Sequence, residues 1–244
     1  MRITAIVGTR PQLIKLAALR PHLTAPIEPF VVDTAQHHDE LLAGQIYRDL
    51  GMTPPDLLLP EPGGLHGEAR LHAMTAALEA TLASQTPEVA LVFGDTDSTL
   101  AGALAAQDHG VPIIHVEAGV RSGDLTMPEE RNRIAVDKIA ALRLCTSDTA
   151  IAALEREGRG DGNEVVGDLM ADLVARLAPA ARSLSALDQV GARIGRSLVS
   201  GGYVFATLHR ADVREPSRLR AALAALQRAA EVLAVPVIFA AHPG

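Results

Sequence analysis

Two acidic side chains follow short apolar runs of this 244-residue chain in a way that indicates acid–base chemistry. Asp95 comes two residues after the run at 89–93, and Glu117 comes directly after the run at 112–116. The carboxyl ends of parallel strands share one edge of a sheet, so we expect both carboxyls to face one cleft. Close like charges raise the pKa of one group, which prepares an acid and a base side by side.

A cluster of cations is predicted at the first strand-to-helix turn, GTRPQLIK. Gly8 permits a tight turn, and Pro11 suits the first helical position. A helix N-terminus favours an anion, and the side chains of Arg10 and Lys15 are expected to point toward it. Either cation alone would ordinarily be a solvated surface residue, but together they favour a bound diphosphate. The chain has neither GxGxxG nor GxxxxGK[ST], so dinucleotide and P-loop motifs are absent.

Other polar residues have competing structural explanations. Asp97 is expected to cap a helix, and magnesium binding by Asp95 with Asp97 is the lower-ranked alternative because cations already serve the diphosphate. Glu129 and Glu130 open a predicted helix, where acids are favoured in any case. His209 follows a later strand and is a candidate ligand in a cleft between two domains.

The sequence predicts no metal site. Asp39 and Glu40 follow His37 and His38 directly, but neighbouring side chains diverge, and no second cluster with metal-ligand spacing is present.

Short apolar runs alternate with helical patterns along the chain, at residues 3–7, 30–32, 89–93, 112–116, 141–145, 203–208 and 235–240. This alternation predicts an α/β fold with a parallel sheet covered on both faces. Helices are expected at 42–50, ending at Gly51, at 71–82, ending before Pro87, and at 216–233.

The pattern divides the chain into domains. Residues 1–168 form a first Rossmann-like, doubly wound domain. Residues 169–200 form connecting helices, with an interruption at Pro179. Residues 201–244 begin a second Rossmann-like domain, which we expect to be incomplete in this chain because one strand–helix–strand unit cannot bury both its faces.

Composition excludes several classes of partner. Lys and Arg total 22 against 29 Asp and Glu, a net charge of −7, and no basic run is present. We therefore expect no nucleic-acid or anionic membrane partner. The single cysteine cannot form an internal disulfide, and no run of about twenty apolar residues or signal segment is found, so a soluble, cytoplasmic protein is expected.

Six segments resemble the non-hydrolysing UDP-N-acetylglucosamine 2-epimerase family of bacteria: GTRPQLIK, GDTDSTLAGALAA, HVEAGVRSGD, MPEERNR, VVGDLMADL and TLHR, in this order. The resemblance implies two domains of the glycosyltransferase-B type with a UDP-sugar in the cleft between them. It implies conversion of UDP-GlcNAc into UDP-ManNAc for cell-surface polysaccharide precursors, no cofactor, and a homodimer.

The resemblance also assigns roles to residues. The family's catalytic carboxylates correspond to Asp95, Glu117 and Glu129. Its catalytic or diphosphate-contacting positions correspond to Arg10, Lys15 and His209, although the sequence after His209 departs from the usual pattern.

Two further segments bear on regulation and substrate. Gln36 and His37 resemble a segment that binds a second UDP-GlcNAc as an activator, although Ala35 stands where the family commonly has glycine. Gln12, His66 and VVGDLMADL look closer to the branch acting on UDP-2,3-diacetamido-glucuronate, which is the runner-up substrate.

The chemistry of C2 suggests a mechanism without a cofactor. No carbonyl acidifies the C2 proton, so direct abstraction is too costly. If UDP leaves C1 while a carboxylate removes that proton, a glycal forms, and re-addition of UDP with protonation from the other face inverts C2. The alternatives are a UDP-sugar glycosyltransferase whose Asp95 and Glu117 bind the acceptor, a UDP-sugar-binding fragment without catalysis, and a structural module that binds no nucleotide.

Overall fold

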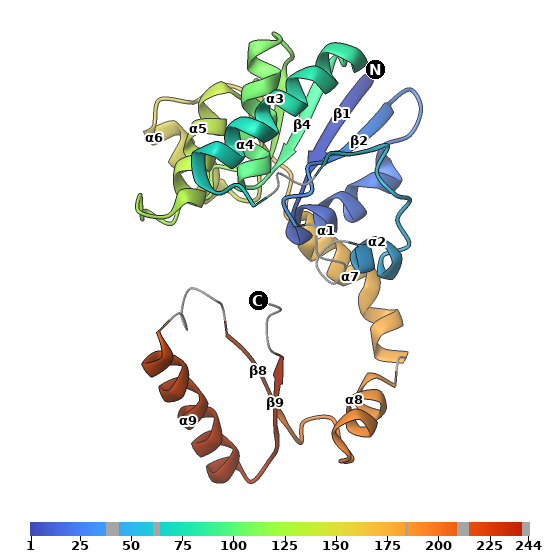
Figure 1. The fold of residues 1–244 in the computed structure, drawn as a ribbon, viewed down its shortest axis with the longest axis vertical. Coiled ribbons are helices and arrows are strands. Elements are labelled where there is room, and N and C mark those ends of the chain that lie inside the picture. Colours follow the sequence, from blue (N-terminus) through green and yellow to red (C-terminus); the bar gives the residue numbers. More distant parts are fainter. Residues whose placement is uncertain (38–43, 61–63, 184, 209–214, 241–244) are drawn as a thin grey trace. The chain divides into compact units, whose positions relative to one another are not determined.

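The computed structural model describes residues 1–37, 44–60, 64–183, 185–208 and 215–240. The chain divides into two units, Met1–Leu177 and Ala178–Gly244. Figure 1 shows the larger unit as a sheet flanked by helices.

The larger unit is built on a parallel sheet. In the part of the chain that the structure describes, its strands have the order β3-β2-β1-β4-β5-β6-β7. They are β1 (Arg2–Val7), β2 (Glu28–Asp33), β3 (Leu57–Leu58), β4 (Val89–Phe93), β5 (Ile113–Ala118), β6 (Leu142–Cys145) and β7 (Asn163–Val165). The chain builds outward from β1 through β2 to β3 and then returns to add β4 on the other side. The carboxyl ends of β1 and β4 therefore flank the point where ligands bind in such sheets.

Helices cover both faces of this sheet. One face packs against α3 (Gly67–Gln85), α4 (Asp97–Asp108) and α5 (Pro128–Ile139), around a core that includes Ile6 and Val92. The other packs against α1 (Arg10–Leu19), α2 (Gly44–Asp49) and the start of α7 (Leu169–Ser183), around Val7 and Phe93. Neighbouring residues of one strand thus enter opposite cores, which explains the continuous apolar runs. The remaining helices of this unit are η1 (Arg20–His22) and α6 (Asp148–Arg156).

The helices α2 and α3 end close to the turn residues that the sequence predicted. Gly51, with φ of +61°, follows α2. The C-cap of α3 is Thr86, which lies in the left-handed region directly before Pro87. The predicted helix at 216–233 is α9 (Pro216–Leu233).

Three features differ from the sequence prediction. The short strands β3 and β7 were not predicted, because two or three residues show no periodicity. The predicted interruption at Pro179 is wrong, since α7 continues through it to Ser183. Proline removes the hydrogen bond to Ala175, but that residue is exposed, so water can satisfy its carbonyl group.

The smaller unit contains α8 (Ala186–Ile194) and one strand–helix–strand motif, in which β8 (Val204–Thr207) and β9 (Val237–Ala240) pair in parallel. The predicted connecting region at 169–200 contains α7 and α8. Within the described ranges, no helix is both long and apolar enough to cross a bilayer.

Candidate functional site

Asp95 and Glu117 meet on one arginine at the carboxyl edge of the sheet. Nη2 of Arg133, on α5, lies 2.6 Å from Oδ2 of Asp95 and 2.9 Å from Oε1 of Glu117. Lys15, on α1, pairs through Nζ with the other oxygen of Glu117. The structure therefore brings together the two acids singled out in the sequence, and two cations compensate their charges. We call Asp95, Glu117, Lys15 and Arg133 the rim network.

The cations of the rim network are more deeply buried than its acids. The side chains of Lys15 and Arg133 are 7% and 9% exposed, whereas those of Glu117 and Asp95 are 22% and 27% exposed. Burial raises the pKa of Asp95, and Glu117 raises it further, against the lowering effect of Arg133. The like-charge effect expected from the sequence is therefore present, but desolvation is the larger cause.

The backbone at Glu117 is unusual. Its φ is +67°, in the left-handed region that favours glycine, and the pairing of β5 with β6 shifts register between Val116 and Ala118. Such a bulge redirects a side chain from the regular alternation of a strand. The ion pairs with Lys15 and Arg133 hold Glu117 in this conformation.

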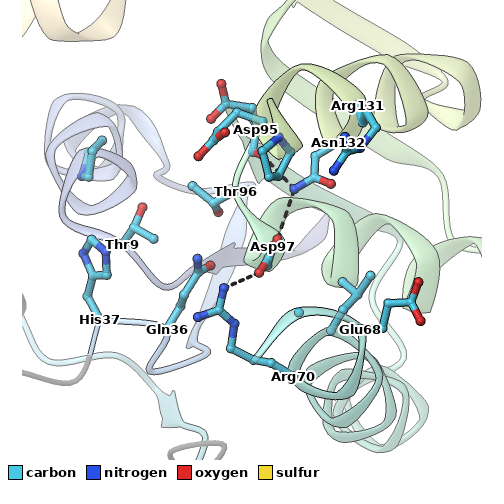
Figure 2. A pocket seen from close by; sticks show the side chains of 15 residues that line it. Thr9, Gln36, His37, Glu68, Arg70, Asp95, Thr96, Asp97, Arg131 and Asn132 are labelled. Carbon is cyan, nitrogen blue, oxygen red and sulfur yellow. Dashed lines mark hydrogen bonds and ion pairs between the residues drawn. The ribbon is translucent and has the colours of Figure 1, made fainter. Parts of the chain in front are cut away.

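A cavity of about 550 Å³ lies beside the rim network and is lined by Asp95 and Glu129, among others. Figure 2 shows Asp97 on its wall, between Arg70 and Asn132. Asp97 pairs with Arg70, and its Oδ1 accepts a hydrogen bond of 3.2 Å from Asn132. The cavity wall is thus built from the starts of α1, α3, α4 and α5 and from the loop after β2.

Asp97 does not cap the helix, so that expectation is wrong. The N-cap of α4 is Thr96, whose side chain forms a reciprocal capping box with Thr99. Asp97 is the first helical residue, and its carboxylate binds Arg70 and Asn132 instead. Among the described residues, no group of three His, Cys, Asp or Glu side chains is arranged to hold a metal ion.

The two glutamates that open α5 have different environments. Glu130 is buried, and its carboxylate accepts hydrogen bonds of 3.0 Å from the N–H groups of Ser122 and Gly123. Burial alone would raise the pKa of Glu130, but these donors hold it below its ordinary value. Glu129 is exposed and lines the cavity. Of the two, only Glu129 is accessible to a ligand there.

The residues expected to bind the diphosphate or an activator have different surroundings, and one of them falls outside the described residues. Lys15 belongs to the rim network. Arg10 is partly exposed, and its side chain makes no hydrogen bond or ion pair with the residues that the structure describes, while its backbone N–H donates to Nδ1 of His37 over 3.2 Å. Gln36 and His37 line the same cavity as Asp95. His209 lies outside the described residues.

The comparison with known proteins decides the family. The family model described as UDP-N-acetylglucosamine 2-epimerase matches residues 22–244. The chain belongs to this epimerase family. It is 36% identical over 249 aligned residues to a UDP-2,3-diacetamido-2,3-dideoxy-D-glucuronate 2-epimerase of Pseudomonas aeruginosa, covering 100% of this chain and 67% of that protein.

Further relatives of this epimerase-family chain agree. A UDP-N-acetylglucosamine 2-epimerase of Methanocaldococcus jannaschii is 32% identical, with coverage of 100% of this chain and 66% of that protein. The crystal structure of a UDP-GlcNAc 2-epimerase of the same organism, in complex with UDP-GlcNAc and UDP, matches with a TM-score of 0.86 and 28% identity, again over 100% and 66% of the two chains. The chain thus spans about two thirds of the length of these relatives. The predicted α/β fold class is confirmed.

Residues near the first turn of this epimerase-family chain have structural roles that the sequence did not reveal. A Cβ atom on Gly8 would lie 1.9 Å from Oγ1 of Thr34 and 2.3 Å from Oγ of Ser98, so close packing rather than turn geometry requires glycine there. Gln12 is buried and donates to the carbonyl group of Phe93 over 2.9 Å. This hydrogen bond joins α1 to the end of β4.

Sequence reasoning missed Arg133, which holds the rim network together. Its signal lay in MPEERNR, because Arg133 follows Glu129 by four residues and so projects from the same side of α5. Arg70 and Asn132 gave no such signal, because their partner Asp97 is 27 and 35 residues away in sequence.

Proposed function

We propose that the protein containing this chain epimerises C2 of a UDP-N-acetylhexosamine, converting UDP-GlcNAc into UDP-ManNAc. The observation that carries the proposal is the rim network, in which two carboxyls share one arginine beside a cavity of about 550 Å³. Membership of the 2-epimerase family supports the same reaction.

The proposed reaction is an elimination followed by a re-addition. One carboxylate removes the C2 proton while the bond between C1 and the diphosphate oxygen breaks, which gives a 1,2-glycal and UDP. A second acid then delivers a proton to the opposite face of C2 as the diphosphate oxygen forms the C1 bond again. Atoms and electrons balance without a redox partner.

The site residues divide these tasks. Burial raises the pKa of Asp95, which favours Asp95 as the group that gives up a proton. Glu117 or Glu129 is then the base. Lys15, Arg133 and Arg10 stabilise the negative charge that develops on the departing diphosphate, and His209 is a further candidate for this role.

Proton NMR of UDP-GlcNAc incubated with the full protein in deuterium oxide tests the proposal. We expect the C2 proton signal to disappear and UDP-ManNAc to form with deuterium at C2, since the proton returns from solvent. Epimerisation without deuterium uptake would refute the elimination. Sugar transfer that requires an added acceptor, with no exchange at C2, would support a glycosyltransferase instead.

A second substrate has its own support. The 36% identity to the diacetamido-glucuronate 2-epimerase extends over the whole chain, so that UDP-sugar is the alternative substrate at the same site. Parallel measurements of kcat/KM with both UDP-sugars decide between them. The preferred substrate is expected to exceed the other by at least about tenfold, since a site built for a polar substituent discriminates strongly against its loss.

We also propose that Gln36 and His37 contribute to a site for a second UDP-GlcNAc that activates the enzyme. Both residues line the cavity that Asp95 also lines, which supports this role. Sigmoidal dependence of rate on UDP-GlcNAc that becomes hyperbolic in Gln36→Ala is the expected result. We further propose that the full protein is a homodimer and that it is cytoplasmic; sedimentation equilibrium of the full protein tests the dimer.

A further inference from the structure

His115 makes hydrogen bonds through both ring nitrogens although it is completely buried. It lies on β5, and its Nδ1 is 2.7 Å from Oδ1 of Asp137 while its Nε2 is 2.7 Å from the carbonyl oxygen of Gly94. A carbonyl oxygen can only accept, so Nε2 carries a proton and donates to Gly94. The other oxygen of Asp137 pairs with Arg121 at 2.8 Å and accepts from the N–H of Gly119 at 3.1 Å.

The two hydrogen bonds of the His115 ring link segments that carry residues of the rim network. Gly94 directly precedes Asp95 at the end of β4, and His115 stands two residues before Glu117. Asp137 follows Arg133 by four residues on α5, one helical turn away. One imidazole ring therefore connects the three elements that carry Asp95, Glu117 and Arg133.

We infer that His115, together with Asp137, is a positioning pair that holds the acids of the rim network in register for proton transfer. The inference rests on the function proposed above. His115 has no exposed surface, so it acts through Gly94 rather than on the substrate. Acid–base catalysis requires placement within about 0.5 Å, and a displacement of about 1 Å can cost about 10²-fold in rate.

Two substitutions separate the two bonds of the ring. His115→Asn retains an amide near the position of Nδ1, which serves Asp137, but loses the donor to Gly94. His115→Gln places its amide nearer the position of Nε2 and so retains a donor toward Gly94. Both replace the ring with a smaller amide, so a purely structural role predicts similar losses in both variants.

Steady-state kinetics of the full protein with UDP-sugar, corrected for the folded fraction by circular dichroism, provides the test. We expect kcat of His115→Asn to fall by about 10–100-fold with KM nearly unchanged, and His115→Gln to recover a large part of it. Equal kcat for wild type and both variants would overturn the inference, as would equal losses in both variants.

A measurement on the unaltered protein covers the case in which the variants do not fold. In ¹⁵N-edited NMR, the Nε2 proton of His115 is expected as a slowly exchanging, downfield signal, and an unprotonated Nε2 would overturn the inference. Absence of C2 exchange in the wild type with either UDP-sugar would refute the proposed function and this inference together. An active wild type with unaffected variants would refute the inference alone.

Discussion

Asp95, which is half-buried, and Asp137, which is fully buried, are two aspartates whose pKa values shift in opposite directions. Each pairs with an arginine, Arg133 at 2.6 Å and Arg121 at 2.8 Å. Burial is the largest influence on both and favours a raised pKa. The pKa of Asp95 is indeed raised, whereas that of Asp137 is lowered, because hydrogen bonds from His115 and Arg121 outweigh burial.

The neighbours explain the difference. Asp137 is fully buried among donors, so its carboxylate is a fixed charge. Asp95 borders a cavity and lies near Glu117 and Glu129, whose charges oppose its ionisation. The same residue type is thus a fixed charge of the fold at one position, whereas at the other it is the proton donor of the proposed reaction. Three predictions test this contrast, and a fourth tests backbone strain at a position of positive φ.

The largest expected effect is on catalysis. Asp95→Asn is expected to lower the rate of C2 exchange by about 10²–10⁴-fold, because it removes a general acid or base. It is not expected to lower the free energy of unfolding at neutral pH, because burial disfavours the charged form that it replaces. NMR exchange rates and urea unfolding measure both quantities. Near-normal turnover would remove Asp95 from the mechanism.

Besides any effect on kcat through its hydrogen bond to His115, Asp137→Asn is expected to lower the free energy of unfolding. Removing one partner of a buried ion pair costs about 3–5 kcal/mol, and the lower end applies because Arg121 keeps its second partner, Glu157, at 2.7 Å. Urea unfolding at neutral pH measures the change. Asp148→Asn, at an exposed helix start, is the matched control and should cost less than about 1 kcal/mol. Equal stabilities of the two variants would contradict the assigned role of Asp137.

The sequence predicted the parts of this contrast that depend on local pattern. The apolar runs located β4 and β5, and the rule for strand ends then placed Asp95 and Glu117 at a common edge. The partners of these acids depend on how helices dock on the sheet, which no local pattern encodes. Arg133 reaches both acids only because α5 packs beside β5.

Residues inside the elements were harder still to interpret. His115 stands in an apolar run, so the sequence gives no reason to treat it as more than a core residue. Its bonds to Gly94 and Asp137 span 21 and 22 residues, which no local pattern encodes. Nothing in the sequence marked the positive φ of Glu117 either, because such a position ordinarily carries glycine.

The pH dependence of stability is expected to differ in sign between the two aspartates. A lowered pKa at Asp137 contributes stability that is present above the ordinary value of 3.8 and is lost as pH falls through the folded-state pKa. A raised pKa at Asp95 works the other way, since stability declines as pH rises from about 3.8 to the folded-state pKa.

Urea unfolding from pH 3 to pH 7 of the wild type and both Asn variants measures these slopes. The deficit of Asp137→Asn relative to wild type should shrink below about pH 4, and any gain of Asp95→Asn should grow above it. Parallel curves for the three proteins would show that neither carboxyl titrates differently in the folded state.

The smallest effect concerns backbone strain. Glu117 and Ala35 both have positive φ, +67° and +53°. Of the two, Glu117 alone makes ion pairs that this backbone conformation allows. Ala35→Gly is therefore expected to raise the free energy of unfolding by about 0.4–1 kcal/mol, because glycine adopts this region without a Cβ clash. Ala80→Gly, on the exposed side of α3, is the matched control and should lower it by about 0.5–1 kcal/mol. A loss of stability in both variants would show that the methyl group of Ala35 contributes more to packing than its positive φ costs.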